Sequence, residues 1–244
     1  MIEADAFARW RPGEPFPPLG DELHLWAFRV DRVEDADWSI LEPDERAKAE
    51  RIRIDSKKVQ RAAARAGLRR LLGAYLHRAP EAIRFDYGEH DKPALAGGEL
   101  QFNLSHSGVW AAVGVQRVGE LGIDVEKSER ERELTLIAER FFSAPERDYL
   151  AALPEAERGA AFYRAWTRKE AYLKAWGTGL TFASSRFSID YAAGQAGRVL
   201  ATEMPGDDPQ RWHFVDLRLA EDYPAAVCCD RKPSRVRCFA LTSS

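Results

Sequence analysis

Cysteine is scarce in this sequence, and its distribution argues against a disulfide framework. The three cysteines, Cys228, Cys229 and Cys238, all lie near the C-terminal end of the 244 residues, and an odd count with an adjacent pair is a poor basis for disulfide bonds. No second cluster supplies the spacing of a zinc site. We interpret the three as small apolar residues of late strands, and expect a reducing, cytoplasmic location.

Long apolar runs and an excess of one charge are also missing. With 36 basic and 39 acidic residues the net charge is −3, so no global feature indicates binding to nucleic acid or to an anionic membrane. No uninterrupted apolar run approaches the ~20 residues that a membrane span needs. The first ten residues lack the basic start and apolar stretch of a signal peptide. We therefore expect a globular chain with no nucleic-acid and no membrane partner.

Two long helices and a series of extended segments organise the chain. Residues 57–78 carry a helical apolar stripe, and a second long helix ends near Trp176, where Gly177 suits a left-handed cap. Extended segments are predicted at 23–30, 100–115, 121–126, 186–191, 212–219, 225–230 and 236–241. Strand, helices and strands in this order, twice over, predict an α+β fold of two pseudo-symmetric halves, 1–118 and 119–244, packed in one monomer.

The first long helix is strongly basic. Between residues 57 and 78 it carries seven arginines and lysines and no acidic residue. Arg61, Arg65 and Arg69 recur at four-residue spacing and so share one face. Such a face is either solvated or binds an anion, because like charges at this spacing repel one another unless something neutralises them. The sequence leaves both interpretations open.

A pair of carboxylates marks the predicted strand at 121–126. Asp124 and Glu126 are two residues apart, so they face the same side of the strand, ~6.5–7 Å apart along the chain. Each raises the pKa of the other unless a cation intervenes, and an all-oxygen site suits Mg²⁺. If the second long helix packs across this strand, Glu170 becomes a third ligand. A solvated strand face is the alternative.

Other polar residues lie where they could contact a phosphate. On the second long helix, Trp166, Glu170 and Lys174 follow at four-residue steps with Lys169 beside them. The two lysines are candidates for binding phosphate oxygens, and an exposed Glu–Lys pair is the alternative. Ser105-His106 is a poor nucleophile–base pair, because adjacent residues of a strand face opposite ways. We expect a turn hydroxyl and an imidazole that donates to a phosphate.

Three motifs together carry a family resemblance. F-N-L-S-H-S at 102–107, G-I-D-V-E at 122–126 and W-T-R-K-E-A-Y-L-K at 166–174, in this order, resemble the signatures of 4′-phosphopantetheinyl transferases. The match favours the larger, surfactin-synthetase-activating type, whose single chain contains two pseudo-symmetric halves. The resemblance covers residues 23–230.

The resemblance implies a role for each matching position. Asp124, Glu126 and Glu170 correspond to the Mg²⁺ ligands, and Lys174 and Lys169 to lysines that bind the phosphates of coenzyme A. The other implied coenzyme A contacts lie in the first half of the chain: Ser105 and His106 at the 3′-phosphate, Lys92 and Pro93 on the adenine side, and Arg61. Asp91 stands where the family often has glycine, and Lys48 aligns only with a one-residue shift.

The implied activity is a transfer of 4′-phosphopantetheine from coenzyme A to a serine of a carrier protein, which converts the apo to the holo form. Glu170, Glu126 and Lys174 are the expected catalytic residues, with Glu170 or a water it holds accepting the serine proton and Glu126 as second candidate. The carrier belongs to a fatty-acid, polyketide, nonribosomal-peptide or siderophore synthase, and we expect a monomer. Lys127, Arg130 and Arg132 are candidates for steering it, whereas Glu129, Glu131 and Glu133 would oppose it. Two alternatives are a non-catalytic coenzyme A or carrier-binding module and a Mg²⁺-dependent phosphohydrolase.

Overall fold

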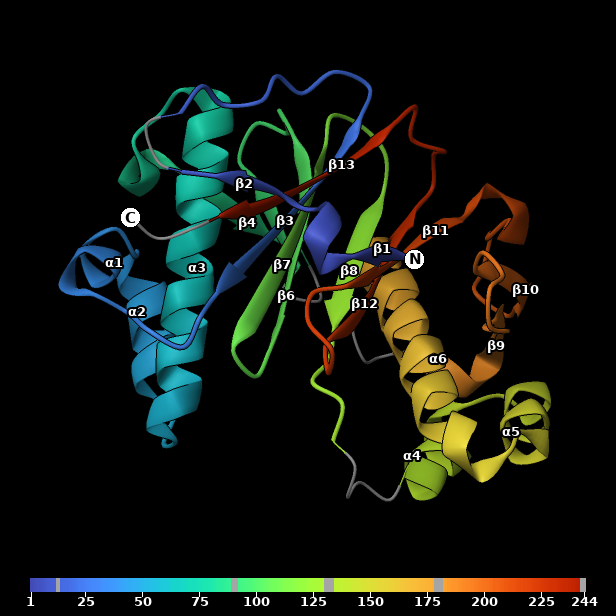
Figure 1. Cartoon of the computed structure of the whole chain (residues 1–244). Coiled ribbons are helices and arrows are strands. Elements are labelled where there is room, and N and C mark those ends of the chain that lie inside the picture. The colour runs from blue at the N-terminus through green and yellow to red at the C-terminus, as the bar shows by residue number, and fades with distance from the viewer. Residues whose placement is uncertain (12–13, 89–91, 130–133, 178–181, 242–244) are drawn as a thin grey trace. The chain divides into compact units, whose positions relative to one another are not determined.

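The structure is a computed structural model that describes residues 1–11, 14–88, 92–129, 134–177 and 182–241. The chain divides into two compact units, which we treat separately. Unit 1 comprises Met1–Ala4, Glu89–Lys92 and Gly119–Lys232, and unit 2 comprises Asp5–Gly88, Pro93–Val118 and Pro233–Ser244. Both units combine helices with β-sheets, so the predicted α+β class is confirmed (Figure 1). The functional division into halves 1–118 and 119–244 stays a prediction.

Unit 1 is built on a four-stranded sheet of order β1-β11-β12-β8, in which β1 is parallel to β11 and the other pairs are antiparallel. The strands are β1 (Ile2–Glu3), β11 (His213–Arg218), β12 (Pro224–Cys229) and β8 (Leu121–Val125). A separate antiparallel pair follows the helices. The remaining elements are α4 (Leu134–Phe141), α5 (Ala144–Ala152), α6 (Glu155–Trp176), β9 (Phe187–Asp190) and β10 (Arg198–Thr202), with short 3₁₀ turns at Ser184–Arg186 and Pro209–Arg211.

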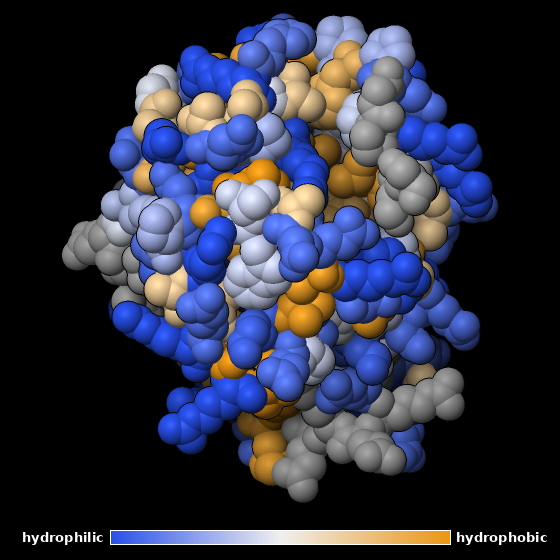
Figure 2. Space-filling model, turned by 90° about the vertical axis from the view of Figure 1, so that its left-hand side faces the viewer, coloured by the Kyte–Doolittle hydropathy of each residue, from blue (hydrophilic) through white to orange (hydrophobic). Residues whose placement is uncertain are grey.

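Unit 2 contains a five-stranded sheet of order β2-β13-β3-β7-β6, with β13 parallel to both of its neighbours. Its strands are β2 (Ala8–Trp10), β13 (Val236–Leu241), β3 (Leu23–Arg29), β7 (Trp110–Gln116) and β6 (Gln101–Ser107). The other elements are α1 (Asp35–Ser39), α2 (Pro43–Glu50), α3 (Asp55–Leu76), the pair β4 (Phe85–Tyr87) and β5 (Pro93–Leu95), and 3₁₀ turns at Ala4–Ala6 and Pro80–Ala82. The face drawn in Figure 2 is mainly hydrophilic, with small scattered hydrophobic patches.

The order of elements repeats between the units. In unit 2, β3 pairs antiparallel with β7, the second strand of the hairpin β6–β7, and in unit 1, β8 pairs in the same way with β12 of the hairpin β11–β12. Between strand and hairpin each unit has short helices and one helix of 22 residues, α3 or α6. The predicted succession of strand, helices and strands is therefore present twice.

The two long helices pack by their predicted stripes and end in left-handed caps. Leu68, Leu71 and Leu72 of α3 are buried in the core of unit 2. Gly177 ends α6 with φ 76°, and its N–H donates to Leu173 O at 3.0 Å, as a glycine cap requires. At the end of α3 the same conformation falls on His77, with φ 52°.

The three cysteines lie in late strands, as the sequence predicts. Cys228 and Cys229 lie in β12 and Cys238 in β13, and all three are buried free thiols. Burial raises the pKa of the Cys229 and Cys238 thiols to about 12, so they stay protonated at neutral pH. Among the described residues no helix is long and apolar enough to cross a membrane.

A buried chain of hydrogen bonds links Trp26 to His24, both on β3, in the core of unit 2. The Trp26 Nε1–H donates to the Tyr75 hydroxyl at 2.8 Å, and that hydroxyl lies 2.7 Å from His24 Nδ1. With one acceptor lone pair of Tyr75 engaged, its O–H can donate to Nδ1, which leaves His24 Nε2 protonated and donating to Glu22 at 3.2 Å. Burial lowers the pKa of His24, in keeping with this neutral form.

Candidate active site

The site is defined by the close approach of β8 to α6 in unit 1. Gly122 of β8 lies so near the helix that a Cβ atom there would stand 2.0 Å from Ala171 O and 2.3 Å from Ala175 N. Any side chain at position 122 would therefore push the strand away from the helix. The helix residues that face Gly122 are the buried Ala171 and Ala175, whose small side chains allow this close approach. The motif G-I-D-V-E contains this glycine, but its packing role cannot be predicted from the motif alone.

This packing brings Asp124 against Lys174. The carboxylate is buried in β8, and Lys174 Nζ lies 2.6 Å from Asp124 Oδ1. Burial raises the pKa of Asp124 to about 7, although Lys174 lowers it, and the neighbouring charges of Glu126 and Glu170 raise it further. The predicted meeting of the carboxylate strand with the Glu170–Lys174 helix is thus present in the structure.

Glu170 belongs to the same electrostatic cluster. Burial raises its pKa, Lys174 lowers it and Glu126 raises it. Lys169 lowers it as well, by a smaller effect. The charge of Glu126, just after β8, thus acts on both Asp124 and Glu170. We name Asp124, Glu126 and Glu170 the carboxylate cluster.

Glu126 is contacted by Trp166, which its spacing predicts on the same arc of α6 as Glu170 and Lys174. Trp166 Nε1 donates to Glu126 Oε1 at 3.2 Å. The order Trp166, Glu170, Lys174 along one arc of the helix is thus reproduced, with each residue facing the end of β8. The spacing alone does not predict this hydrogen bond, because the two partners lie 40 residues apart in the sequence.

Lys169 does not belong to this face, which contradicts the prediction that it binds phosphate. Its ammonium lies 3.0 and 2.8 Å from the two carboxylate oxygens of Glu146 and 2.9 Å from Phe187 O, and its side chain is 1% exposed. A buried, fully engaged ammonium cannot reach a ligand without opening the core. The signal for its partner was the capping box S-A-P-E, whose Glu146 also accepts from Ser143 N at 2.8 Å.

The carboxylate cluster fits a hard divalent cation by its chemistry, since it offers only carboxylate oxygens. Within the described ranges no three His, Cys, Asp or Glu side chains are gathered as a ready-made metal site. The ammonium of Lys174 stands beside Asp124, where a cation would otherwise offset the charge. Metal coordination by Asp124, Glu126 and Glu170 remains a proposal.

The predicted coenzyme A residues of unit 2 lie on separate elements. Ser105 and His106 are in β6, opposite Ala112 and Ala111 of β7, with Ser105 buried and His106 half-buried. Their burial differs because neighbouring strand residues face opposite sides. Arg61 is exposed on α3.

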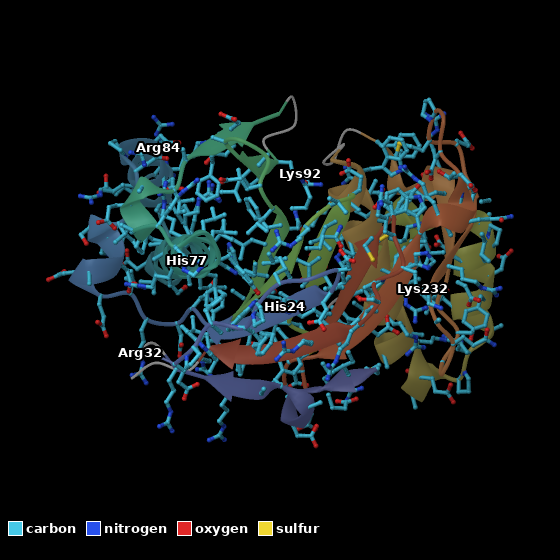
Figure 3. All side chains as sticks on the ribbon, turned by 90° about the horizontal axis from the view of Figure 1, so that it is seen from above. His24, Arg32, His77, Arg84, Lys92 and Lys232 are labelled. Atoms are coloured by element: carbon cyan, nitrogen blue, oxygen red, sulfur yellow. The ribbon has the colours of Figure 1, made fainter. Side chains whose placement is uncertain are left out.

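Lys92 and Pro93 belong to different units. Lys92 belongs to unit 1, where its Nζ donates to Ala175 O at 2.9 Å, near the end of α6, and lies 3.6 Å from Glu120 Oε2 (Figure 3). Burial lowers its pKa, and Glu120 raises it. Pro93 begins β5 in unit 2, opposite Tyr87. Asp91 lies outside the described residues.

The basic face of α3 is largely neutralised from within the protein. Arg69 is completely buried and donates to Glu45 at 2.7 Å and to Glu42 at 2.8 Å, while Arg65 pairs with Glu45 as well. Arg65 and Arg69 therefore neither form a solvated face nor bind an external anion, because carboxylates of the protein itself neutralise them. Arg61 alone of the three points to solvent.

An aromatic residue missed by the sequence lies beside these cations. Lys48 Nζ lies 4.7 Å from the ring centroid of Tyr87, and Arg65 donates to the Tyr87 hydroxyl. Lys48, Arg65 and Tyr87 thus share one exposed corner of unit 2, where the short pair β4–β5 meets α2 and α3. Tyr87 is the last residue of β4, a three-residue strand that is too short to be recognised from its pattern.

The segment proposed to meet the carrier is only partly described. Lys127 is exposed after β8, and the backbone N–H of Glu129, also exposed, donates to the Tyr163 hydroxyl at 2.9 Å. Arg130, Glu131, Arg132 and Glu133 lie outside the described residues. Their role in steering stays a prediction.

Comparison with known proteins identifies the family. Residues 120–228 match the family model of the 4′-phosphopantetheinyl transferase superfamily. The chain is 38% identical over 179 residues to the 4′-phosphopantetheinyl transferase HetI of Nostoc sp., an alignment that covers 70% of this chain and 76% of HetI. The chain therefore belongs to the 4′-phosphopantetheinyl transferase superfamily, and the prediction of a transferase is confirmed.

Two further relatives are also named 4′-phosphopantetheinyl transferases. Sfp of Bacillus subtilis is 34% identical over 148 residues, covering 60% of this chain and 62% of Sfp. AcpT of Salmonella typhimurium is 42% identical over 117 residues, covering 48% of this chain and 59% of AcpT. The chain thus spans less than two thirds of these two relatives, but more of HetI.

Proposed function

We propose that this protein transfers the 4′-phosphopantetheine group from coenzyme A to a serine hydroxyl of a carrier protein domain. The serine oxygen forms a bond to phosphorus, the pyrophosphate bond of coenzyme A breaks, and adenosine 3′,5′-bisphosphate leaves. The observation that carries the proposal is the meeting of Asp124 on β8 with Lys174 on α6, beside Glu126 and Glu170. Membership of the superfamily supports it.

We assign Asp124, Glu126 and Glu170 to holding Mg²⁺. A bound divalent cation would neutralise the pyrophosphate and the charge that develops on it. The raised pKa values of Asp124 and Glu170 support this assignment, because a carboxylate cluster held at a cost in ionisation gains most from a cation.

Lys174 exchanges partners in this scheme. Its ammonium lies beside Asp124 and offsets that charge. A cation held by Asp124 would offset the charge instead and would leave the ammonium available to a phosphate oxygen of coenzyme A. At 29% exposure its side chain is accessible to a ligand, unlike that of Lys169. We therefore keep Lys174 and omit Lys169 as the phosphate-binding lysine.

Glu170 is the first candidate for accepting the serine proton, directly or through a water. Its raised pKa makes it a better proton acceptor than an ordinary glutamate, which matches the need of a general base near neutral pH. Glu126 is the second candidate. The remaining coenzyme A contacts that we propose are Ser105, His106 and Arg61 of unit 2, together with Lys92 and Pro93.

The acceptor that we propose is a carrier domain of a fatty-acid, polyketide, nonribosomal-peptide or siderophore synthase, and the working form is a cytoplasmic monomer. Incubation with coenzyme A, Mg²⁺ and a panel of apo-carrier domains should give the phosphopantetheine adduct, detected by mass spectrometry. Chelation of Mg²⁺ should abolish it. Coenzyme A binding without adduct would indicate a binding module, and loss of coenzyme A without any acceptor would indicate a phosphohydrolase.

A further inference from the structure

Trp166 lies one helical turn before Glu170, and its indole reaches the end of β8. The Nε1–H donates to Glu126 Oε1 at 3.2 Å. The backbone N–H of Glu126 donates to Pro224 O at 3.0 Å, which extends the pairing of β8 with β12 by one residue. The main chain of Glu126 is thus fixed by the sheet, and one oxygen of its side chain is fixed by the helix.

The indole of Trp166 packs against a stack of buried aromatic rings. Phe162 stacks on Trp166 with centroids 5.9 Å apart and an interplanar angle of 13°, and Phe142 stacks on Phe162 at 5.2 Å with the same angle. Phe141 of α4 meets the indole edge-on at 5.4 Å. Because Phe142 and Phe162 are fully buried, the indole cannot turn its N–H away without opening the core.

The carboxylates around Glu126 indicate the function of the hydrogen bond from Trp166. Glu126 raises the pKa of both Asp124 and Glu170, so it lies within electrostatic reach of both carboxylates. A hydrogen bond donated to one oxygen of a carboxylate fixes the direction of its oxygens.

We propose that Trp166 is a positioning residue: its N–H holds the Glu126 carboxylate in the direction needed to bind a divalent cation. This inference rests on the proposed function, because it assumes that the carboxylate cluster binds a metal. Residues that hold a metal ligand in place commonly change metal affinity or activity when replaced, without touching the metal. Trp166 acts through Glu126 in this way.

Trp166→Phe tests the proposal, since phenylalanine keeps an aromatic ring on the stack and removes the N–H. Direct binding of Mn²⁺, followed by electron paramagnetic resonance, should weaken by about tenfold. The kcat for carrier modification should fall, while the KM for coenzyme A stays unchanged.

Trp176→Phe is the matched control. Trp176 is on the same helix, and its buried Nε1 has no hydrogen-bond partner among the described residues. This variant removes the same atom from α6 and should leave Mn²⁺ affinity at the wild-type value. Equal Mn²⁺ affinity in Trp166→Phe and wild type, or equal losses in both variants, would overturn the proposal.

A measurement on the wild-type protein covers the case in which Trp166→Phe does not fold. In ¹⁵N-labelled protein, the indole N–H resonance that shifts in Glu126→Gln should be the one that shifts on addition of Mg²⁺. A resonance that responds to Glu126→Gln but not to Mg²⁺ contradicts the positioning role. If wild-type protein binds no Mn²⁺ and modifies no carrier, the proposed function itself has failed, whatever Trp166→Phe does.

Discussion

Lys169 and Lys174, five residues apart on α6, are expected to respond in opposite ways when replaced by methionine. Lys169→Met keeps the length of the side chain but removes the ammonium that lies 3.0 and 2.8 Å from the Glu146 oxygens. Removal of one partner of a buried ion pair costs about 3–5 kcal/mol, because the other charge stays buried and uncompensated.

The surroundings of Glu146 place the cost at the lower end of this range. Its carboxylate still accepts from Ser143 N at 2.8 Å, Ser143 Oγ at 3.0 Å and Ile189 N at 2.8 Å. We therefore expect a loss of about 3 kcal/mol, which corresponds to a Tm lower by roughly 6–12 °C for a chain of this size. Glu146→Gln combined with Lys169→Met should recover part of the loss, because no charge is left buried.

Lys174→Met should destabilise the protein less. Its side chain is 29% exposed, and Asp124, with a pKa of about 7, can take up a proton when the ammonium is gone. Thermal unfolding by circular dichroism and coenzyme A binding by calorimetry separate the two lysines. Lys169→Met should lower Tm and keep coenzyme A affinity. Lys174→Met should change Tm little and weaken coenzyme A binding. If Lys169→Met weakens coenzyme A binding while Tm is unchanged, the assignment of Lys169 as structural is wrong.

Three further predictions follow from the same contacts. Glu170→Gln should abolish carrier modification while the Tm of the ligand-free protein stays or rises, because one charge of the carboxylate cluster has gone; normal turnover by this variant would remove Glu170 from the site. Lys174→Met should bind Mn²⁺ more tightly than wild type without coenzyme A, since the competing ammonium is absent, and weaker binding would refute the exchange of partners. The folded-state pKa of His24 lies below 6.5, so between that value and 6.5 only the unfolded chain is protonated, and the stability that neutral His24 contributes falls as pH decreases below 6.5. Urea unfolding should show this loss in wild type and not in His24→Gln, and parallel pH profiles would contradict it.

Much of the fold follows from local patterns that the sequence displays. The apolar stripe with Leu68, Leu71 and Leu72 identified α3, and Gly177 marked the end of α6. Capping, periodicity and glycine preferences depend on neighbours within a few residues, so they are readable without the tertiary structure. The strand 121–126 was recognised in the same way.

The function of individual polar side chains was harder to predict, because it depends on what packs against each face of a helix. Lys169 and Glu170 are adjacent in sequence, yet one faces Glu146 of α5 and the other faces the carboxylates of β8. The spacing of residues along α6 cannot by itself separate them, since adjacent residues differ by only ~100° around a helix. The partner of Lys169 lies 23 residues away on another element.

Each unit contains a capping-box glutamate that pairs with a buried cation of the following long helix. This shared arrangement explains why two cations that looked like anion-binding residues are structural. Glu45, at the third position of α2, closes a capping box and binds buried Arg69 of α3; Glu146, at the third position of α5, closes a capping box and binds buried Lys169 of α6. The separations are 24 and 23 residues. A short helix whose first turn fixes a carboxylate can thus hold a cation inside the following long helix at little extra ordering cost. Such a repeat supports the pseudo-symmetry of the units at the level of residues, and a cation of a long helix that follows a capping-box glutamate at this separation is better interpreted as a core contact than as a ligand contact.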